Sequence, residues 1–435
     1  MHLVLVESSK KATIVNDHIN ALGLSSSYQC SFTAGRIFDF ELNNHFNWSA
    51  RNGETLAYLE RMIQRCEMVI AMTDADEQGE YIAYQIAVIA DRYNKETKKA
   101  DLVELTSIGI NRALNTLREL DIPIIQKTHS ERLVHLKVGQ MTIEHGFNVS
   151  SIHELMVTEY LATNDLINVL QEQDHSTTKY FLSRNTENFN VKELPLKPPS
   201  TFDVYTNALI DRSVDLVELE GELQCLYENG LLSYARTPSN EWLPEAVDHI
   251  DSLADANGYT SDSKFLESHT SVNVPHSALY IVKPNASALN LKSLALVSEW
   301  SLSIACPNGL RAFSSDVDSP ILNLKHNMKT QRSRAHPQLQ VLTALRDIDL
   351  FKPSTSAKIS HKIATRYFNG DHLIKPRLDK SRFCTKAIFP ELTKYVEKRT
   401  NPLNVLINSE ITSSNLEVNH SIAERTFVEL TQKGR

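Results

Sequence analysis

The stretch GLLSYARTPSN, residues 230–240, follows a predicted helix and decides how the rest of the chain is interpreted. Asn229 and Gly230 tolerate left-handed backbone geometry and are expected to end that helix. Tyr234 follows, with Arg236 two residues later. A phenol beside a guanidinium suits attack on a phosphodiester, with the phenol as nucleophile and the guanidinium on the phosphate oxygens. In the simpler interpretation, Tyr234 only closes a hydrophobic core. The helix is predicted from apolar residues at helical spacing, namely Leu216, Leu219, Leu223, Leu226 and Tyr227.

Length and composition restrict the class of protein. With 435 residues, 41% of them hydrophobic, the chain is long enough for several domains. No apolar run reaches the length of a membrane span, and the first residues do not have the pattern of a signal peptide. The five cysteines form no Cys-x-x-Cys pair, which argues for a reducing compartment and against a zinc ribbon. No ATP-binding phosphate loop occurs. These features predict a cytoplasmic protein without a nucleotide cofactor.

The net charge of −8 is distributed unevenly along the chain. Residues 325–336 contain no acid, and residues 352–386 are also rich in Lys and Arg. The basic side chains of the first stretch are Lys325, Lys329, Arg332 and Arg334. A basic stretch is more often a solvated face than a binding site. Two of them in an acidic protein make binding to a phosphate backbone an equal alternative.

Acidic residues follow two predicted strands near the N-terminus. Residues 3–6 are predicted to form a buried strand that ends at Glu7, and residues 68–72 a second strand that leads to Asp74 and Asp76. A helical stretch follows each strand, which predicts a parallel α/β layer with ligands at the carboxyl ends of its strands. Carboxylates in that position suit a hard cation such as Mg²⁺. The alternative is that Asp74 or Asp76 caps the next helix.

The stretch around Tyr234 resembles the active-site segment of type IA DNA topoisomerases, Gly-(Leu/Tyr)-Ile-Thr-Tyr-Met-Arg-Thr-Asp-Ser. The glycine, tyrosine, arginine, threonine and serine are in register, whereas Pro238 stands where the family usually has an acid. The N-terminal strands are similar to the Toprim domain of that family. The resemblance implies that Tyr234 is the nucleophile, that Arg236 and Lys11 stabilise the charge on the phosphate, and that Glu7 protonates the 3′ leaving oxygen.

The resemblance also implies a metal site. Glu7, Asp74 and Asp76 would hold Mg²⁺, which would assist resealing. Gln78 stands where the family has an acid, so one carboxylate of the set is missing. An amide oxygen is a weaker ligand, and the neighbouring acids on the helix point elsewhere. The site is therefore expected to bind Mg²⁺ weakly.

Three further segments resemble DNA-binding segments of the family. Gly-Arg-Ile-Phe-Asp-Phe places Arg36 where the family has a histidine, and Pro-His-Ser-Ala places His276 near the active site. Phe-Lys-Pro-Ser-Thr resembles Gly-Arg-Pro-Ser-Thr and implies DNA contacts for Lys352, Ser354 and Thr355. Ser354 and Thr355 are also expected to cap the helix that follows.

The fold implied is multidomain α/β plus α+β. It has a Rossmann-like Toprim domain, helical and winged-helix-like supporting domains and a small β arch, arranged as a toroid. The expected domains are Toprim, 1–121; helical support, 122–170; arch, 171–199; nucleophile domain, 200–310; second part of the arch, 311–330; and winged-helix-like support, 331–435. The zinc-bearing tail of many family members is expected to be absent.

The activity implied is ATP-independent relaxation of negatively supercoiled DNA. One strand would be cleaved through a 5′-phosphotyrosine intermediate and religated by a monomer associated with the nucleoid. The expected partner is a single-stranded segment of the duplex. Gln78, Glu131 and His135 depart from the family pattern, and the family's strand-groove segment is not recognisable. These departures support the alternative of a catalytically impaired Toprim-fold DNA-binding clamp. The enzyme is favoured by the retained residues, namely Glu7, Lys11, Asp74, Asp76, Tyr234 and Arg236. A Toprim nuclease or primase would leave the stretch around Tyr234 unexplained.

Overall fold

The structure is a computed structural model. It describes residues 1–41, 48–144, 151–163, 179–183, 192–193, 197–210, 214–272, 274, 276–284, 292–306, 311–315, 336–370 and 372–388. These residues belong to two compact units, the first within residues 1–141 and the second within residues 142–401. No helix in the described part of the chain is long and apolar enough to cross a membrane.

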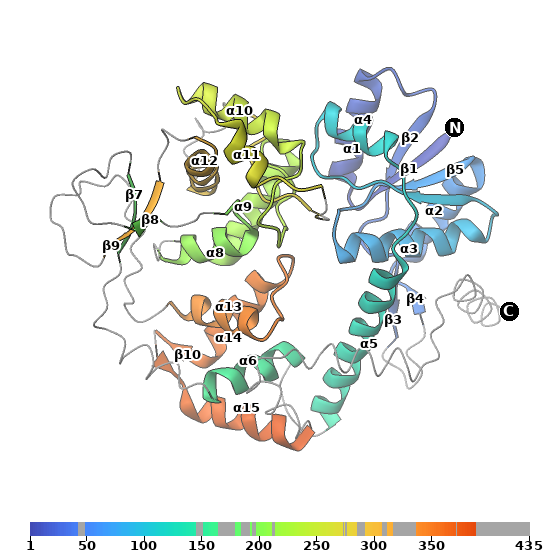
Figure 1. The fold of residues 1–435 in the computed structure, drawn as a ribbon. Coiled ribbons are helices and arrows are strands. Elements are labelled where there is room, and N and C mark those ends of the chain that lie inside the picture. Colours follow the sequence, from blue (N-terminus) through green and yellow to red (C-terminus); the bar gives the residue numbers. More distant parts are fainter. Residues whose placement is uncertain are drawn as a thin grey trace. The chain divides into compact units, whose positions relative to one another are not determined.

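The first unit contains a parallel sheet of four strands in the order β2-β1-β5-β6 (Figure 1). The strands are His2–Val6 (β1), Tyr28–Phe32 (β2), Met68–Ala71 (β5) and Glu96–Lys99 (β6). From β1 the chain moves to β2 on one side and later returns to β5 on the other side. Ligands of open α/β sheets bind outside the strand ends at such a switch point. The predicted parallel layer is confirmed, and the ends of β1 and β5 are neighbours.

Four helices connect and cover these strands, Ser9–Ala21 (α1), Gly53–Arg65 (α2), Glu77–Asp91 (α3) and Ser107–Asn115 (α4). α1 contacts α4, and α2 contacts α3. Leu3 and Leu5 of β1 and Val69 and Ala71 of β5 share a core with α2 and α3. Side chains alternate between the two faces of a strand, so the intervening residues lie on the other face. Burial on both faces explains why β1 and β5 are almost entirely apolar.

A small hairpin and a long helix complete the first unit. Phe38–Phe40 (β3) pairs with Trp48–Ala50 (β4), and Ile122–Glu144 (α5) follows α4. The buried amide of Gln85 on α3 accepts hydrogen bonds from the backbone N–H groups of Ile37 and Phe38 and donates to the carbonyl of Phe38. These bonds anchor the hairpin to α3.

His129 of α5 lies among aromatic rings of the hairpin and α3. Its neighbours are Phe40, Trp48 and Tyr81, and the Tyr81 hydroxyl is 3.0 Å from its Nδ1. Burial lowers the pKa of His129 from 6.5 to about 4. The imidazole is therefore neutral at pH 7.

Acidification is expected to destabilise the first unit through His129. The pKa of His129 is lower in the folded protein than in the unfolded chain. Between about pH 6.5 and 4, the unfolded chain therefore binds a proton at His129 and the folded protein does not. The stability is fully present above about pH 6.5 and decreases toward pH 4 by up to about 3 kcal/mol. Hydrogen-exchange protection of α3 and α5 peptides at about pH 7 and 4.5 measures this loss. A His129→Gln variant should lose less stability between these two pH values than the unchanged protein. Equal losses would contradict the assignment of the effect to His129.

The second unit contains two groups of helices (Figure 1). The first group is Thr201–Ile210 (α8), Leu216–Glu228 (α9), Ala246–Ala256 (α10), Ser263–Ser268 (α11) and Lys292–Ala305 (α12). The second is Ile152–Thr163 (α6), Pro337–Asp347 (α13), Ser356–Tyr367 (α14) and Lys375–Ile388 (α15). A short antiparallel pair, Phe368–Asn369 (β10) and His372–Leu373 (β11), follows α14. Helices followed by a small hairpin agree with the winged-helix-like interpretation.

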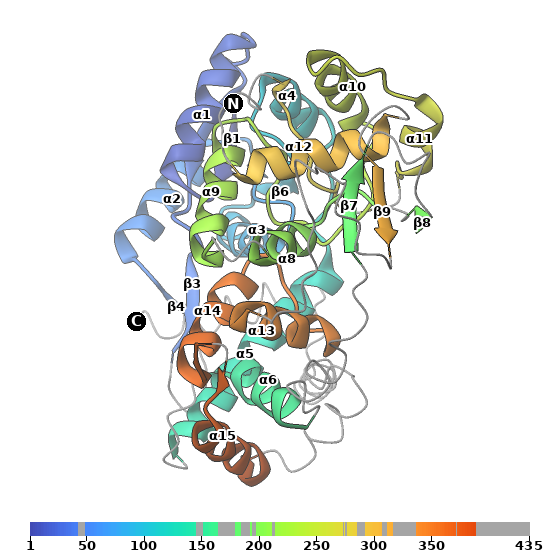
Figure 2. The same ribbon diagram turned by 90° about the vertical axis from the view of Figure 1, so that its left-hand side faces the viewer.

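The second unit also has a three-stranded antiparallel sheet in the order β7-β9-β8. Its strands are Lys179–Ser183 (β7), Lys192–Glu193 (β8) and Arg311–Ser315 (β9). β7 and β9 run side by side in Figure 2 and pair over five residues. The chain therefore returns at β9 to the sheet begun by β7 and β8, as expected of the arch segments. The toroid and the domain boundaries stay predictions.

Candidate functional site

The ends of β1 and β5 bring three predicted site residues together. Glu7 follows β1, and its Oε1 accepts a hydrogen bond from the backbone N–H of Asp74 at 3.1 Å. The Lys11 ammonium, on the first turn of α1, forms an ion pair with the Asp74 carboxylate. The side chains of Lys11 and Asp74 are only 4% and 2% exposed. A buried pair of this kind is costly to break, so Lys11 and Asp74 hold one another in place.

The electrostatics of this site act mainly on Glu7. Burial and the charges of Asp74 and Asp76 raise the pKa of Glu7 to about 7, against the opposing effect of Lys11. Glu7 is therefore protonated in a large fraction of molecules at neutral pH. A carboxyl group with this pKa can donate or accept a proton near pH 7.

Asp76 has a structural role at the start of α3. It is the N-cap residue, and its Oδ1 accepts a hydrogen bond from the Gly79 N–H at 2.7 Å. The capping alternative is therefore confirmed for Asp76. A capping oxygen can still belong to a carboxylate near a cation, so this finding leaves the predicted metal role untested.

The acids here fit a divalent cation in chemistry and only partly in arrangement. Oxygen ligands suit Mg²⁺, and the raised pKa of Glu7 reports negative charge that a cation would relieve. In the described parts of the chain, however, no three His, Cys, Asp or Glu side chains are placed to hold one ion together. Asp74, which would help to hold a cation, already pairs with Lys11.

The acids beside Gln78 have other partners. Glu77 accepts from Lys127 at 2.8 Å, and the buried Glu80 accepts from Arg118 at 2.8 Å and from the backbone N–H of Asp121. This agrees with the expectation that neither acid replaces the carboxylate missing at Gln78.

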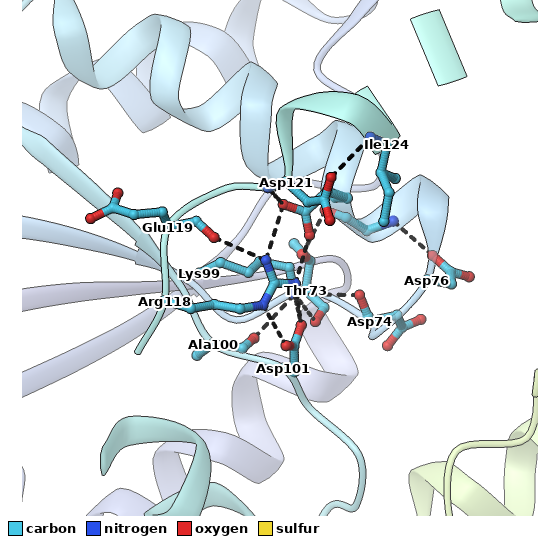
Figure 3. Close-up of polar contacts among 12 residues, drawn as sticks. Thr73, Asp74, Asp76, Lys99, Ala100, Asp101, Arg118, Glu119, Asp121 and Ile124 are labelled. Carbon is cyan, nitrogen blue, oxygen red and sulfur yellow. Dashed lines mark hydrogen bonds and ion pairs between the residues drawn. The ribbon is translucent and has the colours of Figure 1, made fainter. Parts of the chain in front are cut away.

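A second charged network lies under the Asp74 turn and was not predicted (Figure 3). Lys99, at the end of β6, is fully buried and donates to the carbonyls of Thr73 and Asp74 at 3.0 and 3.4 Å and to Asp101 at 2.9 Å. Arg118 donates to Asp101 at 2.7 and 2.9 Å. Burial alone would raise the pKa of Asp101, but Arg118 and Lys99 outweigh it and lower that pKa to about 2. Lys99 thereby fixes the backbone of the turn that carries Asp74.

Gly79 is held against the same turn. Its N–H donates to Asp76, and its carbonyl accepts from the Thr73 hydroxyl at 2.7 Å. A Cβ at this position would lie 2.0 Å from the carbonyl oxygen of Asp74. The backbone of Asp74 leaves no room for a side chain here.

Gly79→Ala is expected to destabilise the first unit by about 1–3 kcal/mol, because the Asp74 turn must move away from the new methyl group. Thermal unfolding and hydrogen exchange around Asp74 measure the effect. The matched control is Gly53→Ala on α2, where an added Cβ meets nothing within 4 Å. Similar behaviour of the two variants would show that the turn yields easily.

Arg36 lies in the loop next to Glu7. The N–H of Gly35, whose φ is +81°, donates to the carbonyl of Glu7 at 2.8 Å. The Arg36 guanidinium pairs with Asp39 at 3.4 Å. Arg36 therefore neighbours the strand-end site, and its DNA-binding role stays a prediction.

The Tyr234 loop in the second unit is fixed on both sides. α9 ends as predicted, with Asn229 as C-cap and Gly230 at φ +63°. Before the tyrosine, the backbone N–H of Ser233 donates to the carbonyl of Tyr280, and the Tyr280 N–H donates to the Ser233 hydroxyl, both at 3.0 Å. After the tyrosine, the backbone N–H of Thr201 donates to the carbonyl of Thr237 at 2.9 Å, and the backbone N–H of Thr237 donates to the Thr201 hydroxyl at 2.8 Å. This bonding gives the segment a defined conformation without regular secondary structure.

The Tyr234 side chain is buried and has two rings as neighbours. Tyr227 packs edge-on at 5.4 Å between ring centroids, and the His276 ring lies 6.4 Å away. Arg236 forms an ion pair with Glu220 of α9 at 3.6 Å. The structure thus brings Tyr234 and His276 together. Burial of Tyr234 also agrees with a packing role, so its catalytic role stays a prediction.

The segment of Lys352, Ser354 and Thr355 precedes α14. Thr355 occupies the N-cap position, but its side chain makes no capping hydrogen bond. The Ser356 hydroxyl instead accepts from the backbone N–H of Lys352 at 2.9 Å. Side-chain capping by Thr355 is therefore a wrong prediction, and the DNA contacts of the segment stay untested. The basic stretch from Lys325 lies outside the described residues until His336.

Comparison with known proteins agrees with this arrangement. Residues 2–105 match the Toprim domain. Reverse gyrase 1 of Sulfurisphaera tokodaii is 21% identical over 291 residues, which make up 58% of this chain and 24% of that protein. Full-length topoisomerase I of Thermotoga maritima superposes with a TM-score of 0.61 at 14% identity, over 94% of this chain and 90% of that chain. The chain is therefore similar in fold to topoisomerase I, and its N-terminal part matches the Toprim domain.

The Toprim match confirms the resemblance seen in the N-terminal strands, whereas the resemblance around Tyr234 stays a prediction. At 14% identity the Thermotoga enzyme shows a shared fold. The match to the reverse gyrase spans about a quarter of that protein's length. Activity, substrate and partners of this chain are therefore argued from its own residues.

Proposed function

We propose that the protein relaxes negatively supercoiled DNA without ATP, by transient cleavage of one strand. The observation that carries this proposal is the Tyr234 loop. Tyr234 is presented on a segment held by hydrogen bonds on both sides, next to His276 and two residues before Arg236. A Toprim nuclease or primase would have no use for this arrangement.

In the proposed reaction the Tyr234 hydroxyl loses its proton to solvent, and its oxygen attacks the phosphorus of one strand. The new bond is a 5′-phosphotyrosyl ester, and the bond to the 3′ oxygen breaks. Glu7 gives its proton to that oxygen, and its pKa of about 7 suits this transfer at neutral pH. Arg236 and Lys11 stabilise the negative charge of the phosphorane. Religation reverses each step, and the phosphotyrosine conserves the bond energy, so no nucleotide is needed.

Mg²⁺ is proposed as the cofactor, with Glu7, Asp74 and Asp76 as the residues that would hold it. When bound, the cation would add positive charge near the phosphate and favour resealing. Lys11 already compensates the negative charge of Asp74. We therefore expect weak Mg²⁺ binding and a requirement for Mg²⁺ that is greater for resealing than for cleavage.

The DNA-binding residues proposed are Arg36, His276, Lys352, Ser354 and Thr355, in a cytoplasmic, nucleoid-associated monomer. The alternative is a DNA-binding clamp without activity. It is supported by the departures from the family pattern at Gln78, Glu131 and His135. Incubation with negatively supercoiled plasmid and Mg²⁺ separates the two. Relaxed topoisomers are expected, whereas binding without relaxation would support the clamp.

A further inference from the structure

A carboxylate on α9 holds two cations beside the Tyr234 loop. Glu220 is buried, with its side chain 7% exposed. One of its oxygens lies 3.6 Å from the Arg236 guanidinium, and the other lies 4.0 Å from the Lys358 ammonium of α14. The side chains of Arg236 and Lys358 are 24% and 68% exposed, so solvent reaches both cations.

The helices that carry these groups are fixed by a second polar contact. Asp215, the N-cap of α9, accepts from Gln338 at 3.0 Å and lies 2.9 Å from Nδ1 of His361. His361 is on α14, three residues after Lys358, so both side chains are on one face of the helix. α9 and α14 also pack directly against one another. The distance between Lys358 and the Tyr234 loop is therefore set by the fold.

The Arg236 guanidinium and the Lys358 ammonium lie close to the same carboxylate. Two positive groups so placed can also bind the negatively charged oxygens of a phosphate. Arg and Lys are the side chains that bind backbone phosphates, the first through paired N–H groups and the second as a point charge. Glu220 itself has no place in the proposed reaction. A buried carboxylate is costly without countercharges, and Arg236 and Lys358 supply them.

We propose that Arg236 and Lys358 together bind a backbone phosphate of single-stranded DNA, and that the Glu220 carboxylate occupies them until the phosphate displaces it. The proposal rests on the proposed function, which supplies the single strand. It adds Lys358 to the DNA-binding residues and makes Glu220 a positioning residue that weakens binding. The negative charge of Glu220 opposes an incoming phosphate, so its removal strengthens binding.

The test is the binding of a short fluorescein-labelled oligothymidylate by the full chain, followed by anisotropy between about 50 and 200 mM salt. Glu220→Gln is expected to raise affinity roughly fivefold, as expected for loss of one competing ion pair. The slope of log affinity against log salt concentration should become steeper by about 0.7. Without the Glu220 charge, salt anions neutralise the two cations in the free protein, and DNA binding releases them. Glu218→Gln removes the same charge from an exposed position of α9 and is the matched control. It should change neither value.

The increase in DNA affinity caused by Glu220→Gln must depend on Arg236 and Lys358. In an Arg236→Ala, Lys358→Ala background, Glu220→Gln should have no effect on affinity. Persistence of the increase there, or an unchanged salt slope in a Glu220→Gln protein that binds, would overturn the site alone. A decrease in affinity would make Glu220 a purely structural residue. Absence of binding by every variant at low salt would overturn the site together with the proposed function, whereas binding without plasmid relaxation would overturn only the latter.

Discussion

Replacement of Tyr234 by Phe is expected to abolish plasmid relaxation and covalent attachment to DNA. The phenol oxygen is the proposed nucleophile, and no other group forms the phosphotyrosyl bond in its absence. The ring supplies the packing against Tyr227 and His276, and Phe retains it. Binding of single-stranded DNA should therefore stay near that of the unchanged protein. Plasmid relaxation assays measure the first activity, and denaturing gels of labelled oligonucleotide measure covalent attachment. Both are expected to fall by at least about 10⁴-fold.

The control for this variant is Tyr227→Phe. Tyr227 is buried like Tyr234 and packs against the Tyr234 ring, but it has no role in the proposed chemistry. It should retain relaxation at a small cost in stability. Relaxation by Tyr234→Phe would remove the basis of the proposed function. Loss of activity in both variants would instead point to packing around the loop.

Two parts of the structure could be predicted from local sequence. The end of α9 was predictable because Gly230 accepts a positive φ and the apolar spacing stops there. The strands before Glu7 and Asp74 were predictable because buried parallel strands are short apolar runs. The same logic places their carboxyl ends at one edge of the sheet, and the bond from Asp74 to Glu7 agrees with it.

Other features depend on contacts between residues far apart in sequence. Lys99 is the last residue of β6, and its place at a strand end was the only sign of a role in the site. Arg118 forms an isolated β-bridge with Lys99, and nothing in its sequence neighbours indicates Asp101 and Glu80 as partners. The contact between Glu220 and Lys358 requires the packing of α9 on α14, which is decided by whole helix faces. For Asp76, capping and metal binding both use a carboxylate at the start of a helix, so sequence could not separate them.

Glu7→Gln is expected to reduce strand cleavage by about 10²–10⁴-fold, the usual contribution of a positioned acid. An amide cannot give a proton to the 3′ oxygen, although it keeps the shape of the side chain. The unchanged protein should also show a characteristic pH dependence. The protonated form of Glu7 is the active form for cleavage, so the cleavage rate should be constant below its pKa of about 7 and fall about tenfold per pH unit above it. Single-turnover cleavage of a labelled oligonucleotide between about pH 6 and 9 measures both effects.

Stability separates loss of the acid from loss of the fold. The pKa of Glu7 is raised from 4.5 in the unfolded chain to about 7, so its contribution to stability is present below pH 4.5 and is lost as pH rises through 7. At about pH 8 the ionised group therefore destabilises the first unit. Glu7→Gln removes that charge and should be more stable there by about 1–3 kcal/mol, although it is inactive. Hydrogen exchange of β1 and α3 peptides measures this gain. A variant that is both inactive and less stable at pH 8 would show that Glu7 acts through the fold and that its carboxyl group is not the proton donor.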